Sequence, residues 1–322
     1  MASLDQIREK LKKQEEQKSN SSNTDNQIYP FWNIPNNSQV LLRFLPDGDD
    51  NNTFFWRERL MIHLPFPGIK GHDEEKPTEV KVPCMEMYDK TCPILSEIRN
   101  WFNDSDLEPL ARKYWKKYSY VYQGFVVEDK LGEENPPENP IRRFIINRSI
   151  HTIIKDSILD TDMEELPIDF DRGRDFKIKK TKNGDYASYT SSGWSQKNRS
   201  LSETERQAVK DHGLFNLSEF LPNQPNSESL NAIKELFKAS VDGELYDPAK
   251  WGEFYKPYGV QINSNNDSTE EKTNKKSSME NLKKQVKNES NDDETEVSQD
   301  TQDESGENSA EDILNKIRNR KK

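Results

Sequence analysis

Residues 111–127 read "ARKYWKKYSYVYQGFVV", in which tyrosines and lysines precede a short apolar run. Alternate side chains of a β-strand share one face. One face would carry Tyr114, Lys116, Tyr118, Tyr120 and Tyr122, and the other Val121, Phe125 and Val127. The stretch therefore predicts a strand that buries an apolar face and presents a ladder of phenol rings, with a cation among them, on the opposite face.

Strand signals recur on both sides of this stretch, at 39–46, 53–64 and 141–147, and the Asn183-Gly184 dipeptide predicts a hairpin within 174–190. Helical patterns occur at 149–159, with Ser149 as N-cap, and at 202–221 and 227–240. We therefore expect a mainly β fold with α, an oligonucleotide-binding (OB-fold) barrel with C-terminal helices. A Pro-rich, His/Cys-bearing stretch at 65–100 is expected to form an inserted subdomain.

The composition predicts a folded core between two poorly ordered arms. Hydrophobic residues make up 31% and charged residues 33% of the 322 residues, which is too polar for compact folding throughout. Every aromatic residue lies between Tyr29 and Tyr258. We expect a core over 21–258, an N-terminal arm over 1–20 and a disordered acidic tail over 259–322.

Both arms carry short helical patterns that would need a partner surface. Residues 3–18 combine a capping box with apolar residues on one face, but too few of them for a stable isolated helix. Residues 289–312 hold eleven acidic residues and no Lys or Arg, which equals the net charge of −11. The last residues, from Ser309, combine Ile and Leu with a basic end and predict a docking helix.

The expected location is a reducing cytoplasm, without membrane contact. The two cysteines cannot build a disulfide framework, and no apolar run approaches the roughly 18 residues that span a bilayer. The first residues, "MASLDQIREK", lack the apolar segment of a secretory signal.

Aromatic rings beside cations are typical of single-stranded nucleic-acid binding, because unpaired bases stack on the rings while Lys and Arg follow the phosphates. The alternative for any one tyrosine is a second core layer, and for a run of lysines a solvated surface. The candidate contacts are Arg112, Lys113, Tyr114, Lys116, Lys117, Tyr118, Tyr120, Tyr122, Arg142, Arg143, Lys177, Lys179, Tyr186, Tyr189 and Trp194.

The order of five motifs resembles the gene-32-type single-stranded DNA-binding (helix-destabilising) proteins of tailed bacteriophages. The motifs are "LLRFLP", an insertion with "CP", "KKYSYVYQGFVVED", "IRRFIINRSIHTIIKDSI" and "FKIKKTKNGDYASYTSSGWS", and they cover roughly 38–200. The resemblance implies that Tyr120 and its neighbours, with Tyr186 and Tyr189, stack on bases. The family has Trp where this chain has Val121.

The resemblance also implies partners and a location. The N-terminal arm would support cooperative self-association along DNA. The acidic tail would recruit replisome proteins such as a helicase loader, polymerase and recombination factors, and would compete with DNA for the core cleft. The expected location becomes the cytoplasm of the infected bacterial host.

The resemblance implies a zinc site that this sequence does not complete. The family binds zinc through one His and three Cys, and Leu95 stands where the last thiolate is expected. His72, Cys84 and Cys92, or His63 in place of His72, leave three ligands, whereas structural zinc normally has four. Asp89 is an open fourth candidate. We commit to no metal and expect no other cofactor.

The expected function is a non-enzymatic, sequence-nonspecific protein that coats single-stranded DNA in phage replication, recombination and repair. The sequence contains no phosphate-binding Gly-Lys-Ser/Thr loop, no Gly-x-Ser-x-Gly and no His-Glu-x-x-His motif. The alternatives are a single-stranded RNA-binding protein, a general protein-interaction hub and a magnesium-dependent nuclease.

Overall fold

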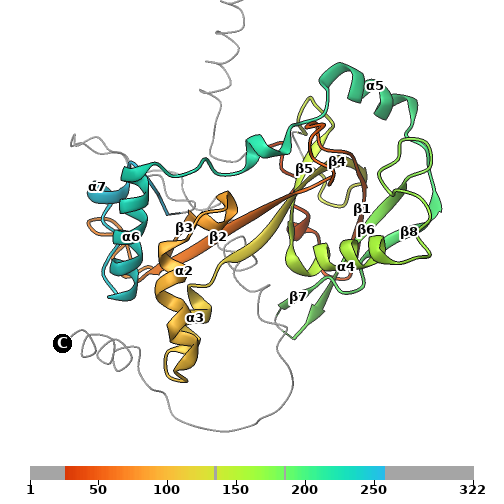
Figure 1. The fold of residues 1–322 in the computed structure, drawn as a ribbon. Coiled ribbons are helices and arrows are strands. Elements are labelled where there is room, and N and C mark those ends of the chain that lie inside the picture. Colours follow the sequence, from red (N-terminus) through yellow and green to blue (C-terminus); the bar gives the residue numbers. More distant parts are fainter. Residues whose placement is uncertain (1–25, 134–135, 185, 258–322) are drawn as a thin grey trace, which may run out of the picture.

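The computed structural model describes residues 26–133, 136–184 and 186–257, which form a mixed α/β domain around an eight-stranded antiparallel sheet (Figure 1). The strands are β1 (Ser38–Phe44), β2 (Arg57–Phe66), β3 (Thr78–Pro83), β4 (Lys117–Glu128), β5 (Arg142–Asn147), β6 (Arg174–Asn183), β7 (Tyr186–Ser188) and β8 (Gly193–Asn198). The α-helices are α2 (Pro93–Ile98), α3 (Glu108–Lys113), α4 (Arg148–Leu159), α5 (Glu203–His212), α6 (Ser227–Val241) and α7 (Pro248–Trp251). The 3-10 turns are η1 (Phe31–Asn33), η2 (Met85–Tyr88), η3 (Arg99–Asn103) and η4 (Leu217–Phe220).

The sheet is organised around β4. One edge of β4 pairs with β5, and the other pairs first with β2 and then with β1. The sheet order is β3-β2-β4-β1-β6-β7, with β5 attached to β4 and β8 to β6. Within the described ranges, no strand pairing joins the two ends of this order.

The strand β2 connects two lobes, because its first half pairs with β4 and its second half with β3. The strand lobe, built on β1, β4–β8 and α4, encloses a cluster with Phe44, Tyr122 and Phe176 at its centre. The helical lobe packs β3, α2, α6 and α7 around the end of β2. In Figure 1 the strands β2 and β4 run diagonally between the two lobes.

The close pairing of β1 with β4 depends on Gly124. Gly124 is the partner of Phe44 in β1 and of Arg142 in β5. A Cβ atom at this position would lie 2.0 Å from the carbonyl oxygen of Arg43, far inside van der Waals contact. Glycine therefore permits the close approach of the two strands.

The segment before β1 is hydrogen-bonded at one end to β5 and at the other end to β6. The amide of Tyr29 donates to the carbonyl of Arg143, and the amide of Asn37 donates to the carbonyl of Lys180, at 2.9 and 2.8 Å. Between these two attachments the chain forms the turn η1. This path places η1 beside the end of β6.

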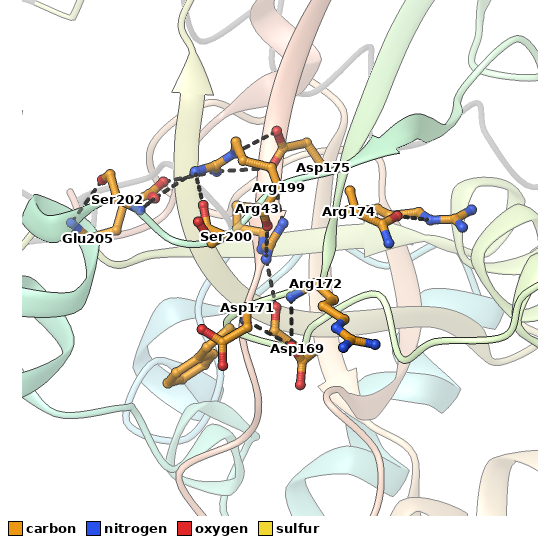
Figure 2. A network of polar contacts seen from close by, with 12 residues as sticks. Arg43, Asp169, Asp171, Arg172, Arg174, Asp175, Arg199, Ser200, Ser202 and Glu205 are labelled. Carbon is orange, nitrogen blue, oxygen red and sulfur yellow. Dashed lines mark hydrogen bonds and ion pairs between the residues drawn. The ribbon is translucent and has the colours of Figure 1, made fainter.

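A network of buried and partly buried ion pairs joins β1, β6 and α5 (Figure 2). Arg43 is fully buried and donates to the carbonyls of Asp169 and Arg199 at 2.7 and 2.9 Å, with Asp175 3.5 Å away. Arg199 binds Asp175 at 2.9 Å and Glu205 at 2.7 Å. Glu205 also closes the capping box that begins α5, so the network fixes this helix to the sheet.

Most predicted elements are confirmed, with local corrections. Asn147 rather than Ser149 caps α4, because its side chain accepts from the amide of Ile150. The predicted helix over 202–221 ends at His212, since Gly213 adopts a φ of 71°. The predicted insertion at 65–100 includes β3, which pairs with β2.

The arms lie outside the described residues. This applies to the predicted N-terminal arm (1–20) and to the tail with its terminal docking helix (259–322). In the described part of the chain, the helices are too short or too polar to cross a membrane.

Candidate nucleic-acid interface

A groove between the two lobes gathers aromatic rings and cations from η1, from four strands, from the start of α4 and from the loop after β7. Its lining residues are Phe31, Trp32, Arg59, Met61, His63, Lys81, Lys117, Tyr118, Ser119, Ile145, Asn147, Arg148 and Tyr189.

The strand register explains the floor of this groove. Arg59, Met61 and His63 are alternate residues of β2 and therefore share one face. Arg59 is paired with Ser119 of β4, and His63 with Lys81 of β3. Because the intervening β2 residues, Leu60 and Ile62, pack into the helical lobe, the polar face is turned toward the groove.

The aromatic wall comes from η1 and the loop after β7. Phe31 is edge-on to Trp32 at 5.5 Å and to Tyr189 at 6.0 Å between ring centroids. Phe31 and Tyr189 are buried, whereas Trp32 is half-buried. Trp32 is therefore the more accessible ring of this wall.

Tyr118 is flanked by two cations. The Nζ atom of Lys116 lies 5.2 Å from the Tyr118 ring centroid, and the guanidinium of Arg148 lies 5.4 Å from it. Arg148 is the first residue of α4, so the position of this helix sets the position of the guanidinium. A cation over a phenol face is favourable and also marks a surface where a planar base could stack.

The groove is cationic. Among the described residues that line it, none is Asp or Glu, whereas Arg59, Lys81, Lys117 and Arg148 are present. His63 lies with Nδ1 3.0 Å from Glu79, and burial lowers the pKa of His63, which favours a neutral imidazole at neutral pH. The lining is therefore complementary to an anionic chain.

The groove contains Lys117, Tyr118 and Tyr189 from the predicted contacts. The predicted ladder of exposed phenol rings on the face of Tyr118 is wrong, because its other three tyrosines are core residues. Tyr114, Tyr120 and Tyr122 are only 2%, 8% and 0% exposed. Tyr114 also precedes β4, as the C-cap of α3, and bonds to Ser240 in the helical lobe.

Three further predicted contacts have structural partners instead. Arg142 is buried and binds Glu133, and Arg143 is buried with its guanidinium 3.6 Å from the Phe220 ring centroid. Trp194 packs edge-on against Phe176. These contacts stabilise the strand lobe. Burial removes Arg142 and Arg143 from the surface that a nucleic acid would contact, whereas Trp194 is half-buried and its assignment as a nucleic-acid contact stays a prediction.

The remaining predicted contacts lie outside the groove lining. Lys116 is bound to Glu86 at 2.6 Å, and Arg112 forms an ion pair with Glu108 within α3. Lys113, Lys177, Lys179 and Tyr186 are exposed. The outward face predicted for Lys177 and Lys179 is confirmed, since Phe176 and Ile178 alternate with them in the core.

The cysteines do not form a metal site with the described histidines. Cys84 and Cys92 are buried with Leu95 in the helical lobe, whereas the His72 side chain is 57% exposed and the His63 side chain lies beside Glu79. The described residues contain no group of three His, Cys, Asp or Glu side chains able to hold a metal ion. The residues present therefore do not fit a structural zinc.

The residues that sequence reasoning missed come from segments far apart in the chain. Phe31 and Trp32 precede the first strand. Arg59 lies on a predicted strand to which no binding role was assigned, and Lys81 lies in the predicted insertion. One signal was present: "RLMIHL" alternates polar or flexible residues with branched apolar ones, which indicates that one face of β2 is not core.

The chain matches no protein-family model and no curated protein.

Proposed function

We propose that the chain binds single-stranded DNA in the groove between its two lobes, without sequence specificity and without catalysis. The observation that carries this proposal is the composition of the groove lining. Trp32 and Tyr118 lie there together with four cationic side chains, and none of the described lining residues is a carboxylate. Stacking on aromatic rings is tolerant of sequence because every base has a π-face.

The fold supports the proposal. A central antiparallel sheet with β4 contacting three neighbours would correspond to an OB-like barrel whose strand face binds the nucleic acid. In this proposal the protein lowers duplex stability by binding the unpaired form, which requires no nucleotide hydrolysis. Its setting would be phage DNA replication, recombination and repair, with self-association and partner recruitment assigned to the two arms.

The test is a tryptophan fluorescence titration with oligo-dT, oligo-U and duplex DNA across a salt series. We expect the affinity for oligo-dT to be well above the affinity for duplex DNA. The logarithm of the binding constant should fall by about 0.7 per phosphate contact for each tenfold rise in salt concentration. Trp32→Ala and Tyr118→Ala should each weaken oligo-dT binding by about 1–3 kcal/mol. Tyr186→Ala is the matched control, because Tyr186 is 54% exposed but lies outside the groove lining.

Three outcomes would change the proposal. Equal affinity for oligo-U would extend it to single-stranded RNA, since stacking alone does not distinguish the sugars. Unaltered binding by Trp32→Ala and Tyr118→Ala would remove the groove as the site. Cleavage of the DNA in the presence of magnesium would replace a binding protein with a nuclease.

A further inference from the structure

We infer that Lys180 is a positioning residue that holds Trp32 in the groove, rather than a phosphate contact. The inference rests on the proposed function, because it concerns how the same groove is built. Lys180 lies in the basic run "KIKKTK", and a run of lysines beside aromatic residues predicts contacts with the phosphates of a nucleic acid.

The lysines of this run divide between the two faces of β6. Lys177 and Lys179 are exposed, whereas Lys180 is 7% exposed and shares the inward face with Phe176 and Ile178. This parity follows from the period of two in a strand. Lys180 therefore extends its ammonium group beneath the surface.

The ammonium group is bound to the turn that carries Trp32. Its Nζ atom donates to the carbonyl of Trp32 at 2.6 Å and to the carbonyl of Ile34 at 3.2 Å. The carbonyl of Lys180 accepts from the amide of Asn37 at 2.8 Å, so the same residue holds the turn and the chain that follows it.

The turn needs such support. The 3-10 turn η1 has three residues and no side-chain cap at its N-terminal end. A turn of this length has little stability of its own, and a charge-assisted hydrogen bond to carbonyls at its end is stronger than a neutral one. Without Lys180, η1 would populate other conformations and the indole of Trp32 would no longer be preorganised for stacking.

The test is a double-mutant cycle between Lys180→Met and Trp32→Ala, measured by oligo-dT binding to the full chain over a salt series. We expect Lys180→Met to weaken binding at least about five-fold, with an unchanged salt slope, and to add little in the Trp32→Ala background. Lys180→Arg should recover part of the loss. Lys179→Met, on the exposed face of the same strand, is the matched control.

A readout on the free protein distinguishes positioning from general destabilisation. With 5-fluorotryptophan at the six Trp positions, Lys180→Met should shift the resonance of Trp32 and leave that of the distant Trp251 unchanged. Should Lys180→Met fail to fold, Lys180→Gln and Lys180→Arg allow the same comparison, because each keeps a donor with a different reach.

The outcomes separate this inference from the proposed function. A salt slope reduced by about 0.7 would make Lys180 a phosphate contact and overturn the inference. An equal loss in the wild-type and Trp32→Ala backgrounds would also overturn it, with the groove still the binding site. Unchanged binding by Trp32→Ala itself would instead refute the proposed function.

Discussion

Acidification should loosen the helix that carries Arg148, through protonation of His151. His151 lies one turn into α4, is 6% exposed, and is stacked on Tyr120 with ring centroids 3.4 Å apart. Its Nδ1 atom is 2.7 Å from the hydroxyl of Tyr122. A neutral ring with Nδ1 unprotonated accepts this hydrogen bond, whereas a protonated ring cannot.

Burial, with a smaller contribution from the charge of Lys155, lowers the pKa of His151 from 6.5 to about 4. Because the pKa is lower in the folded state, the unfolded chain binds more protons between these values, and stability falls as the pH falls. The loss relative to pH 7.5 is about 2 kcal/mol at pH 5 and about 3 kcal/mol at pH 4. This is a large share of the ~5–15 kcal/mol that stabilises a typical domain.

The assay compares urea unfolding of the wild type and His151→Asn from pH 7.5 to pH 4. Asn keeps an acceptor for Tyr122 but does not titrate, and the carboxylates shared by both proteins cancel in the difference. The wild type should lose about 2 kcal/mol more than the variant between pH 7.5 and pH 5. Equal slopes, or an imidazole that titrates near 6.5 by NMR, would refute the reasoning.

Three further predictions concern the ion network and the groove. Asp175→Asn should lower the free energy of unfolding in urea by about 3–5 kcal/mol, because it leaves the buried Arg43 guanidinium without its carboxylate. Arg43→Met should lower it by less, since Asp175 stays paired with Arg199. The reverse order would contradict this account of the network. Lys117→Gln should reduce the slope of log K against log salt concentration for oligo-dT binding by about 0.7. The control Lys179→Gln should leave this slope unchanged. Equal slopes for the two variants would exclude Lys117 as a phosphate contact. Glu79→Gln should tighten oligo-dT binding about two- to three-fold at low salt, because the Glu79 carboxylate beside His63 repels the phosphates. High salt should remove this gain by screening the charges. An unchanged Kd at low salt would count against this effect.

The positions of most strands were predictable, because alternation and turn residues are local signals. The exceptions are β3, which lies in the predicted insertion, and β8, which follows the predicted hairpin. The Asn183-Gly184 dipeptide marks the hairpin that β6 and β7 form, and Gly184 adopts a φ of 59° there. The apolar parity of Phe176 and Ile178 likewise identified the buried face of β6.

The exposure of the tyrosines was not predictable from alternation. Tyr122 and Val121 are both fully buried, so β4 has core on both faces over this part of its length. A central strand of this kind gives no local signal that distinguishes a stacking ring from a packing ring. Composition predicted aromatic rings beside cations, but it did not identify which of these residues line the groove.

Contacts between residues far apart in the chain were also not predictable from the sequence. Arg43 lies in "LLRFLP", where alternation predicts an outward side chain, yet Asp175 and the carbonyl of Arg199 enclose it from a distant part of the chain. The groove has the same origin, since the pairing of β2 with β3 and β4 brings Arg59, Lys81 and Lys117 together.

The continuity of β2 bears on how the proposed nucleic-acid ligand would bind. One unbroken strand supplies Arg59, Met61 and His63 to the groove while pairing with β4 in one lobe and β3 in the other. Because β2 is hydrogen-bonded to β4 and then to β3 along its length, the strand itself provides no hinge between the two lobes. In the proposed function, the entropy lost on association would then fall mainly on the flexible nucleic acid and little on this strand.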